Sequence, residues 1–187
     1  MAALFGTGYQ STWHALVLQQ ELELAELRIC GRTPSAVDRL VAWSKDRGIP
    51  AVGAGPDEAI RDAQVVAAVT AAYEPVFSGS GLAANALVCG VGSTKAERRE
   101  LDAETVRRAD LIYTDSVEGA RTEAGDLVGA AEVGALDWDQ VHDITDVITG
   151  VSGRTPETGI VLYESQGMAL QDVAAAAIVY ARCNGEA

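Results

Sequence analysis

The chain has 187 residues, of which 48% are hydrophobic and 22% charged. This ordinary globular composition argues against a disordered or low-complexity function. The 14 basic and 27 acidic residues give a formal net charge of −13, which argues against nucleic acid or anionic membranes as partners. No apolar run could span a bilayer, and the first residues lack the charged region of a signal peptide. We expect one cytoplasmic domain over residues 1–187.

Short apolar runs alternate with helical stretches over the first 114 residues. Strands are predicted at residues 2–6, 27–30, 49–52, 65–70, 87–91 and 111–114, and helices at 9–22, 34–48, 57–62 and 98–108. The first helix has Trp13, Leu16 and Val17 at helical spacing, and the second has Val37, Leu40 and Val41. This alternation predicts an α/β fold, a doubly wound parallel sheet of the Rossmann type with helices on both faces.

The pattern changes after Asp115. Residues 116–131 are small and acidic, 138–149 look helical, and a late strand is predicted at 160–163. The last helix has one apolar stripe, made of Leu170, Val173, Ala174, Ala177, Ile178 and Ala181.

Metal and disulfide chemistry find little support in the sequence. The cysteines Cys30, Cys89 and Cys183 have no CxxC spacing, so we expect buried, reduced thiols. His142 lies among aspartates in the predicted acidic helix, where a solvated helix face is a simpler interpretation than a metal site. We predict no metal ligands.

The strongest motif lies between the first predicted strand and the first helix and reads Gly6-Thr7-Gly8-Tyr9-Gln10-Ser11. Gly6 would permit a tight turn, and Gly8 would let backbone N–H groups approach a pyrophosphate at the helix N-terminus. Ser11 stands where a third glycine is usual and is still small enough for close packing. The motif predicts dinucleotide binding, with a plain turn or a methyltransferase-type loop as alternatives.

The end of the second predicted strand bears on which dinucleotide is bound. An NAD site usually has Asp or Glu there to accept a hydrogen bond from the ribose 2′-hydroxyl. This chain has Gly31-Arg32-Thr33 instead. Arg32 can bind a 2′-phosphate through charge-assisted hydrogen bonds, and Thr33 can add a hydroxyl. We therefore predict NADP(H) in preference to NAD(H), although Arg32 as a solvated loop charge remains an alternative.

Two later strand ends complete the predicted cofactor crevice. Thr70 and Ala71 follow the fourth strand, and Val91 follows the fifth. In an open parallel sheet, carboxyl ends flank the ligand crevice. Each of these positions, taken singly, could equally be an ordinary strand terminus.

The chain resembles the ornithine cyclodeaminase/mu-crystallin family over almost its whole length. Besides the motifs at residues 6–10 and 31–33, the matching blocks stand in family order. They are Val69-Thr70 with Glu74-Pro75-Val76, Val91-Gly92-Ser93-Thr94, Arg99-Glu100-Leu101-Asp102, Asp115-Ser116, Glu123-Ala124-Gly125-Asp126, and Ser165-Gln166-Gly167-Met168-Ala169 with Asp172.

The resemblance implies an NADP(H)-dependent reductase of a cyclic ketimine, such as 1-pyrroline-2-carboxylate or 1-piperideine-2-carboxylate. It places Thr94 beside the nicotinamide pocket as the catalytic candidate, and Glu123 and Ser165 on the substrate side, although Glu123 could simply be solvated. Ornithine cyclodeaminases resemble one another in having an aspartate base where this chain has Thr94. A threonine hydroxyl cannot replace that base, so NAD-dependent conversion of L-ornithine to L-proline is the second interpretation.

The resemblance also implies an N-terminal domain that supplies a carboxylate-binding arginine, a lysine near the reacting carbon and most of a homodimer interface in full-length relatives. Because this chain begins at the first strand, we expect those residues to be absent and the last helix to expose apolar surface. A catalytically incomplete NADP(H)-binding protein is therefore the third interpretation.

Overall fold

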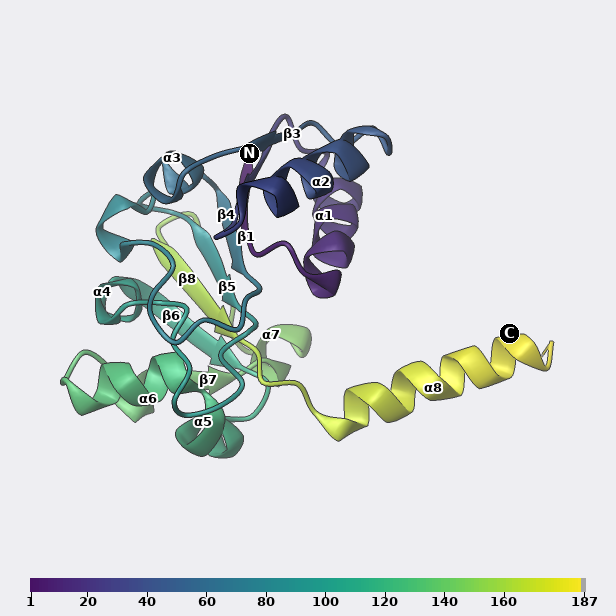
Figure 1. Cartoon of the computed structure of the whole chain (residues 1–187). Helices are drawn as coiled ribbons and strands as arrows, with labels where there is room; N and C mark the ends of the chain where they lie inside the picture. The colour runs from purple at the N-terminus through teal and green to yellow at the C-terminus, as the bar shows by residue number, and fades with distance from the viewer. Residues whose placement is uncertain (186–187) are drawn as a thin grey trace.

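The computed structural model describes residues 1–185, in which eight parallel strands form one sheet flanked by helices (Figure 1). The strands are β1 (Ala2–Phe5), β2 (Leu27–Cys30), β3 (Ala51–Gly53), β4 (Val65–Ala68), β5 (Leu87–Gly90), β6 (Ala109–Thr114), β7 (Val141–Asp143) and β8 (Ile160–Glu164). The helices are α1 (Tyr9–Leu22), α2 (Pro34–Lys45), α3 (Pro56–Ile60), α4 (Ala103–Arg107), α5 (Val117–Glu123), α6 (Gly125–Glu132), α7 (Thr145–Ile148) and α8 (Ala169–Cys183), with 3-10 turns η1 (Gly79–Gly81) and η2 (Trp138–Gln140).

The order of the strands is β3-β2-β1-β4-β5-β8-β6-β7. β2 pairs with one edge of β1 and β3 pairs with β2, whereas β4 pairs with the other edge of β1. This reversal is the topological switch point beside which open α/β sheets bind ligands. The predicted doubly wound α/β fold is confirmed.

Successive side chains of a strand point to opposite faces of the sheet, and two cores form in this way. Leu4 and Ile29 pack with Ala15 and Leu40 under α1 and α2. On the other face Phe5 belongs to a larger core, with other members from α3, α6 and the segment that precedes α4. Full burial of a Leu, Ile or Phe side chain stabilises the fold by about 1.5–3 kcal/mol.

Several sequence-based expectations about the elements are wrong. Residues 138–149 do not form one helix, because Val141 pairs with Ile112 and forms the short edge strand β7 between η2 and α7. His142 therefore lies on a strand, with its ring centroid 6.0 Å from that of Tyr113. The predicted helix at 98–108 is reduced to α4, because the Asp102 carboxylate accepts a hydrogen bond from Thr105 N and caps the helix there.

The burial of some side chains differs from what the sequence suggests. In α1, Trp13 and Val17 are more than half exposed, and Ser11 and Ala15 are the residues buried against the sheet. Only small side chains fit where this helix approaches β1. Of the three cysteines, Cys30 is buried, Cys89 is partly buried and Cys183 is exposed on α8.

Helix α8 projects away from the sheet (Figure 1), and none of its residues is buried. Its exposed large side chains include Leu170, Val173, Ile178, Val179 and Tyr180. This agrees with the expected exposure of the apolar stripe. Within residues 1–185 no helix is both long and apolar enough to cross a membrane.

Candidate functional site

The carboxyl edge of the sheet brings the predicted cofactor-binding segments together. Gly6 N donates to Cys30 O at 2.9 Å, and Val69 N donates to Phe5 O at 2.8 Å. Val91 N donates to Ala68 O at 2.9 Å. The segments that follow β2, β1, β4 and β5 are therefore neighbours in space, around the switch point between β1 and β4.

The turn between β1 and α1 is narrow on its inner side and open on its outer side. Gly6 has a φ of +118°, and an added Cβ would overlap Val69 O and lie 2.9 Å from Ser11 Oγ. Gly8 N-caps α1, and among residues 1–185 no side chain caps this helix and no atom lies within 4 Å of where the Gly8 Cβ would stand. Within the described chain the space beside Gly8, at this uncapped N-terminus of α1, is thus open. A pyrophosphate fits there, because the first N–H groups of α1 and the helix dipole favour an anion.

Thr7, Tyr9 and Gln10 surround this open turn. Thr7 is half-buried and packs against Gly31, where an added Cβ would lie 2.8 Å from Thr7 Cγ2. Tyr9 is 76% exposed, and Gln10 is exposed as well. The contact between the first turn and Gly31 holds the ends of β1 and β2 side by side.

The end of β2 carries a free cation. Arg32 and Thr33 are both exposed. Over residues 1–185 the Arg32 guanidinium forms no salt bridge and no side-chain hydrogen bond, unlike Arg28, which binds Glu26 at 2.6 Å. No carboxylate follows β2 directly. Arg32 is therefore available to bind a phosphate group.

Glu100 links the ends of β4 and β5. Its carboxylate is fully buried and accepts hydrogen bonds from Thr70 N and Gly92 N, each at 2.5 Å. Burial raises the pKa of the Glu100 carboxyl, and these N–H groups offset only part of that rise. Gly92 has no room for a side chain, since an added Cβ would overlap Thr70 O. Glu100 thereby fixes the loops that carry the predicted cofactor residues Thr70, Ala71 and Val91.

Asp126 fixes Glu100 in turn. Its Oδ1 accepts from Glu100 N at 2.7 Å and Leu101 N at 3.1 Å, while its own N–H donates to Ser93 Oγ at 3.1 Å. Oδ2 has no partner within the described chain. Burial raises the pKa of Asp126 to about 7, against the lowering effect of the Leu101 and Glu100 N–H groups.

Glu164, at the end of β8, is a third buried acid beneath this edge. Its side chain is fully buried, and neither carboxyl oxygen has a hydrogen-bond partner among residues 1–185. It fills the space beside Gly90, where an added Cβ would overlap Oε2. Burial raises the pKa of Glu164 well above its ordinary value, and the charges of Asp126, Glu100 and Asp115 raise it further. Both effects favour the neutral form of this carboxyl.

Thr94 and Glu123 lie on two segments that touch. Thr94 is half-buried in the turn after β5, where its N–H donates to Gly92 O at 3.0 Å. Glu123 is exposed at the end of α5. Two residues later Gly125 packs so closely on the carbonyls of Lys95 and Arg98 that an added Cβ would overlap them.

Arg98 and Arg99 are not free surface charges. Both are half-buried, and Arg99 Nη1 donates to the carbonyls of Ala96 and Arg98. Arg99 also packs over Gly129 in α6. Their side chains brace the loop that carries Thr94.

Ser165, the other predicted substrate-side residue, follows β8 and lies beside β5. Its N–H donates to Gly90 O at 2.8 Å, so it is next to the segment that carries Val91. Its hydroxyl donates to Asp115 Oδ2 at 2.8 Å. Asp115 is 2% exposed at the end of β6. This places Ser165 on the same edge as the candidate cofactor residues.

Sequence reasoning assigned no role to the four buried acids Glu100, Asp115, Asp126 and Glu164. Three of them lie in motifs that carry the family resemblance, and a carboxylate directly after a buried strand, as at Asp115, was the available signal. Their burial depends on loops that meet only in the folded chain.

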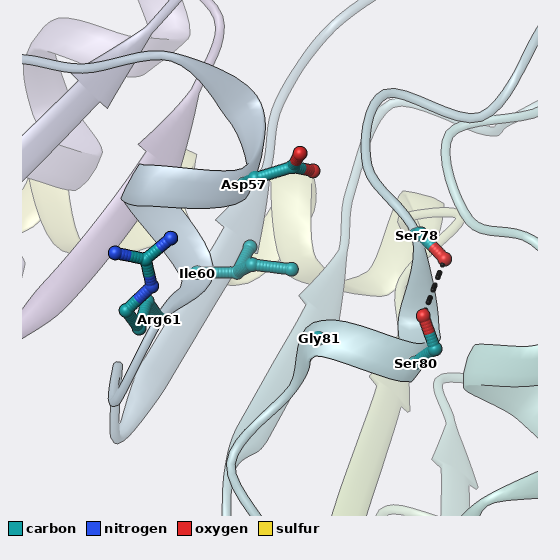
Figure 2. A pocket seen from close by; sticks show the side chains of 6 residues that line it. All are labelled: Asp57, Ile60, Arg61, Ser78, Ser80 and Gly81. Carbon is teal, nitrogen blue, oxygen red and sulfur yellow. Dashed lines mark hydrogen bonds between the residues drawn. The ribbon is translucent and has the colours of Figure 1, made fainter.

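Two cavities lie outside the predicted site. One of about 350 Å³ lies between α3 and η1, where Asp57 and Ile60 face the hydroxyl pair Ser78–Ser80, 2.9 Å apart (Figure 2). Another, of about 340 Å³, is apolar and has Cys89 and Tyr163 in its wall. Neither includes a predicted site residue. Within the described part of the chain, no cluster of His, Cys, Asp and Glu is suited to a metal ion.

The sheet order, the open helix N-terminus at its switch point and the cation after β2 define a dinucleotide-binding fold. The profile of the ornithine cyclodeaminase/mu-crystallin family matches residues 1–187, and the chain belongs to that family. Its relatives include the mouse ketimine reductase mu-crystallin, 32% identical over 178 residues, which cover 95% of this chain and 53% of the relative.

Two further relatives are pyrroline-2-carboxylate reductases. The Delta(1)-pyrroline-2-carboxylate/Delta(1)-piperideine-2-carboxylate reductase of Azospirillum brasilense is 35% identical over 176 residues, covering 92% of this chain and 52% of the relative. The structure of the Thermococcus litoralis Delta(1)-pyrroline-2-carboxylate reductase, solved with NADH and L-proline, superposes with a TM-score of 0.92 at 26% identity, covering 98% of this chain and 58% of that one. The chain thus spans about half the length of the relatives it matches.

Proposed function

We propose that this chain is the NADP(H)-binding part of an oxidoreductase that reduces the C=N bond of a cyclic imino acid. The substrate class is 1-pyrroline-2-carboxylate or 1-piperideine-2-carboxylate, as in the names of the pyrroline-2-carboxylate reductases. The observation that carries the proposal is the uncapped N-terminus of α1 at the switch point, with Gly8 leaving room for a ligand.

Different residues around the crevice bind different parts of the cofactor. The N–H groups that follow Gly8 bind the pyrophosphate, with Gly6, Thr7, Tyr9 and Gln10 shaping the turn. Arg32 and Thr33 bind the 2′-phosphate, which a carboxylate at this position would repel. Thr70, Ala71 and Val91 line the far side, held by Glu100. We propose NADP(H) over NAD(H) on this ground, although the Thermococcus litoralis relative was solved with NADH.

The nicotinamide supplies the hydride, and the chain's contribution is to position the reacting groups. Thr94 lies in the loop after β5, beside the Glu100-bound turn, and offers a neutral hydroxyl there. Ser165 borders the same strand end from β8, and Glu123 is proposed to reach the substrate side from α5. None of the three is a cation that could bind a substrate carboxylate. We propose that this group is bound by residues outside the crevice described above.

Cyclodeamination of L-ornithine is the second candidate. It needs a base at the position of Thr94, and a threonine hydroxyl does not ionise near neutral pH. A third candidate is NADP(H) binding without turnover, which the incomplete set of substrate-binding groups in the crevice favours.

Activity separates these candidates. NADPH oxidation is measured with 1-pyrroline-2-carboxylate, using the chain alone and the chain fused to the N-terminal domain of a pyrroline-2-carboxylate reductase. We expect turnover in the fusion and at least about a hundredfold less in the chain alone, because misplacing a reacting group by 1 Å costs about that much. Equal kcat/KM in both would show that the chain holds a complete site. L-ornithine turnover, or cofactor binding without any reduction, would favour the second or third candidate.

A further inference from the structure

Asp115 lies where β6 ends and accepts four hydrogen bonds from β8, α8 and the segment that joins them. Tyr163 Oη and Gln171 Nε2, the latter at 3.5 Å, donate to its Oδ1. Ser165 Oγ at 2.8 Å and Gly167 N at 2.7 Å donate to its Oδ2. The carboxylate is 2% exposed, so it has little access to water.

This carboxylate accepts every one of these bonds as an anion. Burial alone would raise the pKa of the Asp115 carboxyl, but the hydrogen bonds from Tyr163, Ser165 and Gly167 outweigh that effect and hold the pKa below its ordinary value. An ionised carboxylate has no proton to donate. The Ser165 hydroxyl must therefore be the donor in its bond to Asp115.

A serine hydroxyl has one hydrogen and two lone pairs. With its hydrogen directed at Asp115, Ser165 can only accept a hydrogen bond from a ligand. Ser165 is half-buried and its N–H is bonded to Gly90 O, so it borders the end of β5 at the proposed cofactor crevice.

We propose that Asp115 is a positioning residue that makes Ser165 a hydrogen-bond acceptor, so that this part of the crevice selects a ligand group bearing an N–H donor. The inference rests on the proposed function, which offers two such groups. One is the carboxamide NH₂ of the nicotinamide, and the other is the protonated ring nitrogen of the imino acid or its amino acid product. A ligand with only a carbonyl or ether oxygen at that point would place its oxygen against a lone pair of Ser165 Oγ. No hydrogen bond could form there, so such a ligand would bind more weakly.

Two matched pairs of ligands distinguish these sources. The first is NADP⁺ and its 3-acetylpyridine analogue, which keeps the carbonyl and lacks the amide N–H. The second is L-proline and (S)-tetrahydrofuran-2-carboxylate, which has oxygen in place of the ring nitrogen, each titrated into the fused protein saturated with NADP⁺. Affinities are measured by calorimetry. We expect a preference of about three- to tenfold for the N–H ligand of one pair, the range of a single hydrogen bond.

Four variants test the role of Asp115. Ser165→Ala should bring the ratio of the two affinities in a pair close to one. Asp115→Ala should do the same, because the Ser165 hydroxyl could then donate its hydrogen to a ligand. Asp115→Asn should keep the preference, because the amide oxygen can still accept from Ser165 and Gly167. Thr114→Val is the matched structural control: it removes the 2.8 Å bond between Thr114 Oγ1 and Gln166 Oε1, which ties β6 to the same segment without touching Asp115.

The outcomes separate this inference from the proposed function. A preference in the first pair that depends on Asp115 assigns the donor to the cofactor, and one in the second pair assigns it to the substrate. If the unaltered protein shows no preference in either pair, or if Ser165→Ala and Asp115→Ala keep the preference, the inference is wrong. If Asp115→Ala does not fold, a preference that Ser165→Ala keeps or that Asp115→Asn loses still contradicts the inference. Failure to bind either dinucleotide would instead contradict the proposed function.

Discussion

The ends of β1 and β2 differ from the ends of β4, β5, β8 and β6 in how their polar groups are satisfied. On the first side, the N-terminus of α1 has no side-chain cap and Arg32 has no partner within the described chain. On the second side, backbone N–H groups are taken up by buried carboxylates, as Glu100 takes those of Thr70 and Gly92.

This contrast indicates two different tasks along one edge of the sheet. Unsatisfied donors on an exposed turn are available for an anionic ligand, and leaving them free costs little because water solvates them. Buried donors and acceptors must be paired inside the protein, since an unpaired one costs about 1–3 kcal/mol. The first side, at the ends of β1 and β2, is therefore suited to binding a ligand, and we call it the binding side. The second side, at the ends of β4, β5, β8 and β6, holds loops in place, and we call it the holding side.

The largest effect should come from Gly92→Ala, on the side that holds loops in place. An added Cβ would overlap Thr70 O and approach Glu100 Oε2 to 2.7 Å. We expect a loss of about 3 kcal/mol or more of unfolding free energy in denaturant titrations. Gly119→Ala in α5 is the control, because its Cβ would make only ordinary contacts of 3.5 Å or longer. Equal stability of the two variants would show that the two loops are not held against each other.

Gly8→Val tests the binding side. Gly8 has a φ of −84° and a ψ of −174°, which valine adopts without strain, so the fold should persist. The side chain would occupy the proposed pyrophosphate position, and we expect about a hundredfold weaker NADPH binding, equal to about 2.7 kcal/mol. Gly55→Val is a matched control, since Gly55 N-caps α3 in a similar extended conformation with nothing within 4 Å. Unchanged NADPH affinity in a folded Gly8→Val variant would refute the site.

Arg32→Ala tests which dinucleotide the binding side prefers. Loss of a charge-assisted hydrogen bond to the 2′-phosphate should weaken NADPH binding by about tenfold or more and leave NADH binding unchanged. The measurement is the ratio of the two dissociation constants by calorimetry. Arg39→Ala, on the exposed face of α2, removes the same charge and should preserve the ratio. If NADPH and NADH bind the unaltered chain equally, the NADP(H) preference is wrong.

The last prediction concerns the pH dependence of stability and the buried acids. Because the pKa of Asp126 is raised to about 7 by burial, the folded chain keeps a proton that the unfolded chain loses near pH 4. Its contribution to stability is complete below about pH 4 and is lost as the pH rises to about 7, with a slope of up to about 1.4 kcal/mol per pH unit. Glu100 and Glu164 act in the same direction.

Asp126→Asn should reduce that slope. The amide oxygen can still accept from Glu100 N and Leu101 N, and the group no longer titrates. Unfolding free energies at pH 5, 6, 7 and 8 give the slope, with the exposed Asp57→Asn as a charge-matched control. A slope that is the same in the Asp126→Asn variant and the unaltered chain would assign the pH dependence to other groups.

Much of the binding side could be predicted from the sequence because its signals are local. The glycine turn stands between one strand and one helix, and Arg32 follows the next strand within two residues. The holding side could not be predicted in the same way. Glu100 lies 30 residues from Thr70, and Asp115 lies 50 residues from Ser165. The helical pattern at 98–108 gave no indication that Glu100 is buried, because charged residues at helical spacing indicate a solvated face.

The sequence by itself determined the alternation of strands and helices, the parallel sheet, the glycine turn and the family. These follow from periodicities of two and 3.6 residues and from motifs a few residues long. Only the tertiary structure decided that 141–143 is an edge strand, that Trp13 faces solvent and that four acids are buried beneath the crevice. Those outcomes depend on which distant segments meet, because a carboxylate can be buried only where other parts of the chain exclude water or supply the hydrogen bonds that it loses.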